Sequence, residues 1–163
     1  MDELFTPPGV IWRRVSPRLA VVRRAMLGAA AVVLVGLLAV LAAMADVAAG
    51  EVVLGLLAVG VAMAAAWWLV GRSVRRWGYA ELDEELLITS GALVRRLVVV
   101  PYGRMQYVDV HAGPVDQLTG IATLRLHTAS PGTSAVVPGL PVDEAARLRD
   151  RLTARGETRA AGL

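Results

Sequence analysis

The sequence contains no cysteine and no lysine, and both absences restrict its chemistry. Without cysteine, the chain has no disulfide framework, no thiolate nucleophile and no thiolate-ligated metal. Without lysine, all 17 basic residues are arginine. Positive charge is therefore carried only by guanidinium groups, which bind phosphate in bidentate fashion where they meet it.

An excess of positive charge is also absent from the second half of the chain. Residues 1–76 carry eight arginines and four acidic residues, whereas residues 77–163 carry nine arginines and ten acidic residues. A nucleic-acid-binding protein concentrates basic residues on its folded domain. The nearly neutral second half therefore argues against a nucleic-acid partner.

Two long stretches contain no charged residue at all. Residues 25–45 and 52–70 are apolar throughout, and only residues 46–51 separate them. A helix of about 20 residues is about 30 Å long, which matches the hydrocarbon core of a bilayer. The pattern predicts a transmembrane helical hairpin over residues 25–71. Because ion pathways usually need an ionisable residue within the membrane, this hairpin is interpreted as an anchor.

The residues that flank these stretches predict their orientation. Arginines precede the first stretch and follow the second, while the connecting segment has only Asp46 and Glu51. By the positive-inside rule, the protein is expected to be a multi-pass protein of the bacterial cytoplasmic (inner) membrane with both termini in the cytoplasm. All four tryptophans lie on the arginine side and are expected to anchor at the membrane interface: Trp12, Trp67, Trp68 and Trp77.

A cleaved signal peptide is the alternative for the first stretch, because Ala43-Met44-Ala45 resembles a signal-peptidase site. The charged leader is long, however, and the apolar run is longer than a signal-peptide core. A second apolar stretch also follows at once. The two-helix anchor is therefore the favoured interpretation.

Beyond residue 76 the pattern changes to short β-prone runs separated by turn signals. Residues 72–156 are predicted to form a cytoplasmic α+β domain of six or seven antiparallel strands, built as a barrel or sandwich. Val142, Ala145, Leu148 and Leu152 share one face of a final helix that covers the open end of the sheet, and Asp143 and Arg147 are spaced as an ion pair. Residues 1–24 are interpreted as a basic juxtamembrane segment and residues 157–163 as a disordered tail. The predicted strands are 77–82, 86–89, 92–100, 107–111, 122–128 and 134–137.

One segment carries a family signature. Residues 100–110 read VPYGRMQYVDV and resemble the VPY-x-R-[IM]-Q-x-V-x-V motif of bacterial pleckstrin-homology (PH)-like membrane proteins, the YdbS-like group. Gly113-Pro114-Val115, residues 120–124 (GIATL) and Pro138-Gly139-Leu140 follow in the family order. The resemblance covers about residues 12–155. It implies a membrane-bound PH-like domain, often working beside a larger relative, for which no catalytic residues are established. Asp116 and Gln117 stand where the family often has basic residues, which weighs against headgroup contact at this loop.

Catalytic and metal-binding sites find little support. Asp109, His111 and His127 could be assembled into a metal site, but their spacing matches no specific ligand pattern and a solvated sheet face explains them better. No serine lies in a nucleophile-elbow motif. The chain is therefore predicted to have no catalytic residues, no metal and no cofactor, and to be a non-enzymatic protein.

Two binding hypotheses remain. In the first, the domain is a protein-binding or assembly module at the cytoplasmic membrane face, whose partner is another PH-like membrane protein or a second copy. In the second, a membrane-proximal arginine collar recognises anionic phospholipid headgroups. Tyr102 and Gln106 lie in a turn that is interpreted either as a recognition loop or as a structural corner. The candidate contact residues are Arg72, Arg75, Arg76, Arg95, Tyr102, Arg104 and Gln106, with Arg96 as a further collar arginine.

Overall fold

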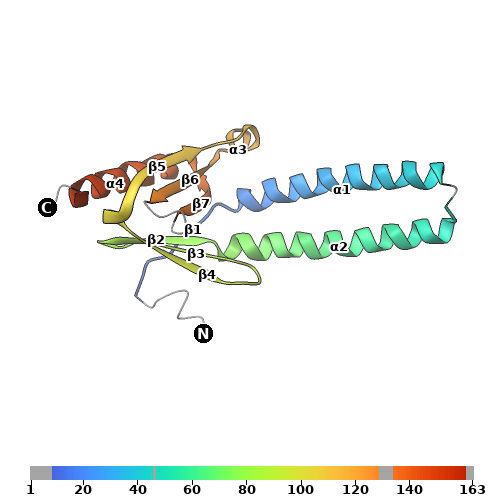
Figure 1. Ribbon diagram of the computed structural model, residues 1–163, viewed down its shortest axis with the longest axis horizontal. Coiled ribbons are helices and arrows are strands. Elements are labelled where there is room, and N and C mark those ends of the chain that lie inside the picture. Colours follow the sequence, from blue (N-terminus) through green and yellow to red (C-terminus); the bar gives the residue numbers. More distant parts are fainter. Residues whose placement is uncertain (1–8, 46, 129–133, 161–163) are drawn as a thin grey trace.

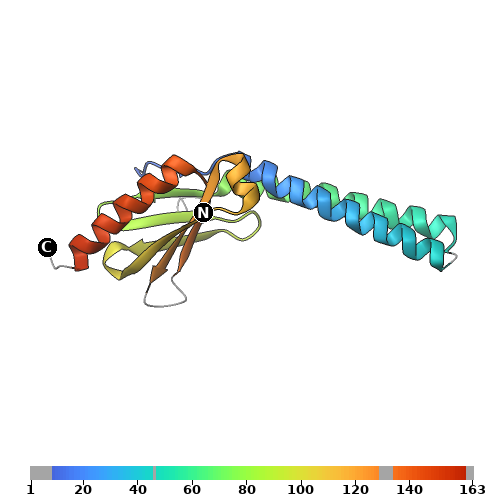
Figure 2. The ribbon, with the colours of Figure 1, turned by 90° about the horizontal axis from the view of Figure 1, so that it is seen from above.

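A helical hairpin projects from one end of a two-layered β domain (Figure 1). The computed structural model describes residues 9–45, 47–128 and 134–160. The hairpin consists of α1 (Arg18–Met44) and α2 (Ala49–Arg76), which lie antiparallel in both views (Figures 1 and 2). Both helices are long and apolar enough to cross a membrane, and their most apolar windows are not buried by the rest of the protein. That exposure distinguishes them from the core helices of a soluble protein.

The β domain is an open sandwich rather than a closed barrel. Its four-stranded sheet has the order β1 (Arg13–Arg14), β2 (Gly78–Glu81), β3 (Glu85–Ser90) and β4 (Arg96–Pro101), and all neighbours are antiparallel. The three-stranded sheet has the order β5 (Met105–His111), β6 (Ile121–Thr128) and β7 (Ala135–Pro141), again antiparallel. A short 3-10 turn, η1 (Tyr102–Arg104), links the sheets. The α+β class and the strand number are confirmed, and of the two predicted forms the sandwich is correct.

The final helix covers the sandwich as predicted. In α4 (Val142–Ala160), Ala145, Leu148 and Leu152 are fully buried, whereas Val142, the first residue of the helix, is half-exposed. The helix continues past Gly156, because this glycine does not adopt the left-handed conformation that would end it. Helical structure therefore extends into the predicted tail as far as Ala160, and residues 161–163 lie outside the described residues.

The N-terminal segment is an integral part of this domain, a role that its sequence pattern did not predict. Strand β1 pairs with β2 through Arg13 and Tyr79, and Val15, Leu19 and Val22 lie in the core. The hairpin is thus inserted between the first and second strands of one sheet. A two-residue strand has no detectable periodicity, so only its pairing reveals it.

Gly139 permits the close approach of this segment to β7. Its φ is +68°, and a Cβ atom there would lie 2.7 Å from Leu19 Cβ. The carbonyl of Gly139 accepts a 2.8 Å hydrogen bond from Ser16 N. A glycine is therefore required both by the backbone conformation and by the packing of α1.

A short helix, α3 (Pro114–Thr119), occupies the position where the sequence predicted only a break. Asp116 Oδ2 accepts a 3.2 Å hydrogen bond from Gly113 N, and Gln117 Nε2 donates a 3.0 Å bond to Ala112 O. The two residues that depart from the family pattern therefore stabilise the start of this helix.

Candidate functional site

The predicted contact residues separate into two groups at opposite ends of the domain. Strand β4 starts opposite Ser90, beside the end of α2, and ends at Pro101, opposite Glu85. A six-residue strand is about 17 Å long from its first to its last residue. The arginine collar predicted from the sequence is therefore divided, because Arg104 lies at the far end, together with Tyr102 and Gln106. The other collar arginines lie toward the hairpin: Arg72, Arg75, Arg76, Arg95 and Arg96.

Several arginines at the hairpin end have partners within the protein. Arg76 Nη1 donates a 2.9 Å hydrogen bond to Ala92 O in the β3–β4 turn. The guanidinium of Arg72 lies 5.4 Å from the ring centre of Trp68, and that of Arg24 lies 5.0 Å from the ring centre of Trp67. The bond from Arg76 attaches the β domain to α2, and the contact of Arg24 with Trp67 joins the two helices.

The four tryptophans do not share one environment. The rings of Trp67 and Trp68 are about half exposed at the domain end of α2, beneath their arginines. Trp77 packs against the core of the β domain, and Trp12 is partly buried. Only Trp67 and Trp68 therefore have the exposed geometry of interface anchors.

Tyr102 is a structural corner and not a contact residue. Its side chain is fully buried, its hydroxyl donates to Leu82 O at 2.9 Å, and it accepts a hydrogen bond from Arg155 Nη1 at 2.8 Å. Burial raises the pKa of Tyr102, against the opposing effect of Arg155. Of the two interpretations of this turn, the structural corner therefore fits Tyr102, because its aromatic ring is buried where η1 links the two sheets. Arg104 and Gln106 are exposed.

A cluster of charged side chains holds α4 against the four-stranded sheet. Glu144 accepts hydrogen bonds from Tyr79 and Arg147, and from Arg13 at 3.0 Å, while Arg147 also bonds Glu81 at 3.1 Å. The hydrogen bond from Arg147 is the main cause that lowers the pKa of Glu144 to about 2. Burial and the bond to Glu144 raise the pKa of Tyr79. The predicted pairing of Arg147 with Asp143 is not formed, since Glu144 and Glu81 take its place.

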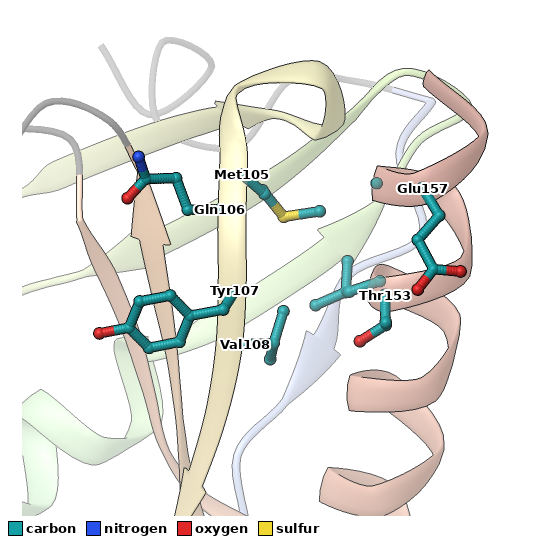
Figure 3. A pocket seen from close by; sticks show the side chains of 8 residues that line it. Met105, Gln106, Tyr107, Val108, Thr153 and Glu157 are labelled. Carbon is teal, nitrogen blue, oxygen red and sulfur yellow. The ribbon is translucent and has the colours of Figure 1, made fainter. Parts of the chain in front are cut away.

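A groove lies at the far end of the domain, between β5 and α4 (Figure 3). Its volume is about 320 Å³. Met105 and Val108 face the helix, whereas Gln106 and Tyr107 point away. A β-bulge interrupts the strand pairing between Met105 and Tyr107, and the consecutive side chains of Gln106 and Tyr107 therefore lie on the same side of β5. The lining residues are Met105, Gln106, Tyr107, Val108, Leu152, Thr153, Gly156 and Glu157.

Strand β5 is the outer strand of its sheet, so in the described part of the chain one side of its backbone has no strand partner. Such an edge can pair with an added strand from another protein. The α4 side of the groove was not found from the sequence. Gly156, near the C-terminal end of the amphipathic helix α4, is a local sign that the helix surface is hollowed there.

Two of the three residues considered for a metal site have other neighbours. The ring of His127 stacks on Tyr107 with 4.2 Å between centroids, and Asp109 lies opposite Arg125 across the strands. Within residues 9–45, 47–128 and 134–160, no group of three or more His, Asp or Glu side chains is placed to hold a metal ion.

The segment that contains both apolar helices and most of the sandwich matches the model of a known protein family. Residues 18–156 match the family model described as bacterial PH domain. The chain belongs to the bacterial PH domain family. The match includes both apolar helices as well as the sandwich, so the hairpin is part of the family pattern.

Two curated relatives of this PH-domain protein are transmembrane proteins of Bacillus subtilis (strain 168). YdbS is 38% identical over 77 residues, which is 47% of this chain and 47% of YdbS. YdbT is 32% identical over 88 residues, which is 51% of this chain and 18% of YdbT. The chain thus spans less than half the length of each. No solved structure gives a significant match. With its two uncovered apolar helices, the PH-domain chain is a membrane protein.

Proposed function

We propose that this protein is a non-enzymatic, membrane-anchored binding module, and that the groove between β5 and α4 receives an extended segment of another PH-domain membrane protein. The observation that carries the proposal is the unpaired edge of β5 beside a hollow that opens at the end of the domain farthest from the hairpin. Main-chain hydrogen bonds at such an edge supply affinity, while side-chain hollows supply specificity.

The orientation of the hairpin belongs to the same proposal. Both helices span the bacterial cytoplasmic membrane, and both termini are in the cytoplasm, because the arginines gather where the helices join the domain. A tag on the C-terminus should resist protease in intact spheroplasts and be cleaved in inverted vesicles. Cleavage in intact spheroplasts would contradict the orientation.

The groove is tested by crosslinking the full chain in its native membrane. A photoreactive amino acid replaces Gln106, which is exposed on the edge strand β5 at the rim of the groove, and a matched control replaces Arg125, which is exposed on the central strand β6. We expect the probe at position 106, and not that at 125, to give an adduct with another PH-domain membrane protein identified by mass spectrometry.

Two substitutions at Gly156 distinguish binding in the groove from chance contact in the membrane. Gly156→Leu adds a side chain that fills the groove, whereas Gly156→Ala adds a methyl group 3.7 Å from Met105 Cε, an ordinary contact. The adduct should disappear in the leucine variant and persist in the alanine variant. An adduct that survives Gly156→Leu, or no adduct at position 106, would reject the proposal. An adduct with a second copy would assign the groove to self-association.

Recognition of anionic phospholipid is the second candidate, supported by the exposed Arg75 and the nearby Arg95 at the hairpin end. Native mass spectrometry of the full chain released from nanodiscs should show less retained phosphatidylglycerol for Arg75→Gln with Arg95→Gln than for Arg104→Gln. Equal retention in the two proteins would remove this candidate.

A further inference from the structure

We propose that two apolar tips at the hairpin end of the PH domain insert into the interfacial layer of the bilayer that holds the hairpin, and so fix the orientation of the domain. The first tip is Leu93 and Val94 in the β3–β4 turn, and the second is Val115 and Leu118 on α3. The inference rests on the hairpin spanning the bilayer, but it does not depend on a partner in the groove.

The first tip is held in a defined conformation. Leu93 is 77% exposed and Val94 80% exposed. Gly91 has a φ of +112°, and a Cβ atom there would collide with the carbonyl oxygen of Val94, so only glycine closes this turn. The hydrogen bond from Arg76 to Ala92 O attaches the turn to the last residue of α2.

The second tip is attached in the same manner to the other helix. Leu118 is 88% exposed and Val115 40% exposed. Arg18, the first residue of α1, donates a 3.1 Å hydrogen bond to Thr119 O at the end of α3. A hollow of about 530 Å³ between α1 and α3 is bordered by Leu118 and by Val21, which is 62% exposed.

The attachment points place both tips close to the membrane surface. Arg18 lies seven residues before the uncharged stretch of α1, and Arg76 lies six residues after that of α2. These separations correspond to about 10 Å and about 9 Å of helix. The polar layer outside the hydrocarbon core is about 5–8 Å thick on each side. Figures 1 and 2 show α3 and the β3–β4 turn at the hairpin-facing end of the domain, so the tips extend from these points toward that layer.

The surroundings favour lipid over a soluble partner. Single exposed apolar residues are ordinary, but here two separate tips share one level beside the two apolar helices. Arg75 and Arg95 add positive charge next to the first tip, which complements an anionic membrane surface. A soluble protein would have to enter the narrow space between the domain and the bilayer.

The absence of cysteine makes a direct test simple, since each introduced cysteine is the only one in the chain. Leu93→Cys and Leu118→Cys, with Arg125→Cys as a matched exposed control on β6, are labelled with an environment-sensitive fluorophore in the full chain. The proteins are reconstituted in nanodiscs of phosphatidylethanolamine and phosphatidylglycerol, without any other protein. We expect a blue-shifted emission at 93 and 118 that is lost when the lipids carry a shallow nitroxide quencher, and neither effect at 125.

Each other outcome overturns the proposal. If iodide in the aqueous phase quenches positions 93 and 118 as strongly as 125, the tips lie in water. If these positions are protected from iodide but not quenched by the lipid nitroxide, protein covers them, which indicates a second copy. A failure of the Gln106 crosslink would leave this result unchanged, so the two proposals are tested separately.

Discussion

At the scale of single residues, Glu144 joins three parts of the domain. It lies on α4 and bonds Arg13 from β1, Tyr79 from β2 and Arg147 from its own helix. Its side chain is 22% exposed, so solvent screens these interactions only in part. A change at this position is therefore expected to loosen the contact between α4 and the first sheet.

We predict that Glu144→Gln lowers the free energy of unfolding by about 2 kcal/mol, because Arg13 and Arg147 then face a neutral amide in place of a carboxylate, and Arg147 keeps only Glu81 as an anionic partner. Asp143→Asn, at the exposed neighbouring position, should change it by less than about 0.5 kcal/mol. Denaturant unfolding of the full chain in micelles, followed by hydrogen exchange in β2 and α4, measures both. Equal losses in the two variants would refute the role of Glu144.

The same residue predicts a pH dependence. The folded pKa of Glu144 is about 2, below its ordinary 4.5, because Arg147 and Tyr79 stabilise the carboxylate. A depressed pKa stabilises the fold above the unfolded value, and this contribution is lost as the pH falls from about 4.5 toward about 2. Stability measured over this range should fall more steeply in the natural chain than in Glu144→Gln. Parallel curves would contradict the prediction.

Two glycine-to-alanine substitutions, one at a crowded position and one at an open position, form a matched pair for stability measurements. Gly139→Ala introduces a methyl group 2.7 Å from Leu19 Cβ at a φ of +68°, and should destabilise the protein by about 1–3 kcal/mol. Gly156→Ala lies in a helix with room for the methyl group, and should be neutral or stabilising by up to about 1 kcal/mol. Thermal unfolding of both variants compares them, and a harmless Gly139→Ala would show that α1 does not pack as described.

At the scale of elements, α4 is held at its far end by the Tyr102 corner. Tyr102→Phe removes the hydroxyl that bonds Leu82 O and Arg155, while Arg155 keeps its 2.5 Å bond to Leu82 O. We predict a loss of about 1 kcal/mol and faster hydrogen exchange in the last turns of α4, with the first turns unchanged. Exchange that rises uniformly along the helix would argue against a local role.

Local sequence patterns predicted some of the helices and strands correctly and missed others. The alternation of Leu124 and Leu126 with Arg125 correctly predicted β6, and helical spacing correctly predicted the buried face of α4. Strand β1 and helix α3 were missed because each is too short for a periodic signal. The β3–β4 turn was predicted too short, since Gly91 to Arg95 all belong to it and β4 begins at Arg96.

At the scale of the whole molecule, the inserted hairpin makes the domain discontinuous in sequence. A fragment of residues 72–163 lacks β1 and the core side chains Val15, Leu19 and Val22. We predict that this fragment is aggregated or poorly dispersed in NMR spectra, and that joining residues 10–24 to its N-terminus through a flexible linker restores dispersion. A well-dispersed spectrum of the shorter fragment would show that the N-terminal segment is dispensable.

The sequence by itself determined the membrane class, the approximate limits of both apolar helices, most strands, the buried face of α4 and the family signature. Hydropathy and periodicity are properties of neighbouring residues, and local patterns therefore report them. Only the tertiary structure decided that the sandwich is open, that residues 13–22 complete it, that Tyr102 is buried, and that the contact residues lie at two ends. These features depend on contacts such as that of Arg13 with Tyr79, which the whole hairpin separates along the chain.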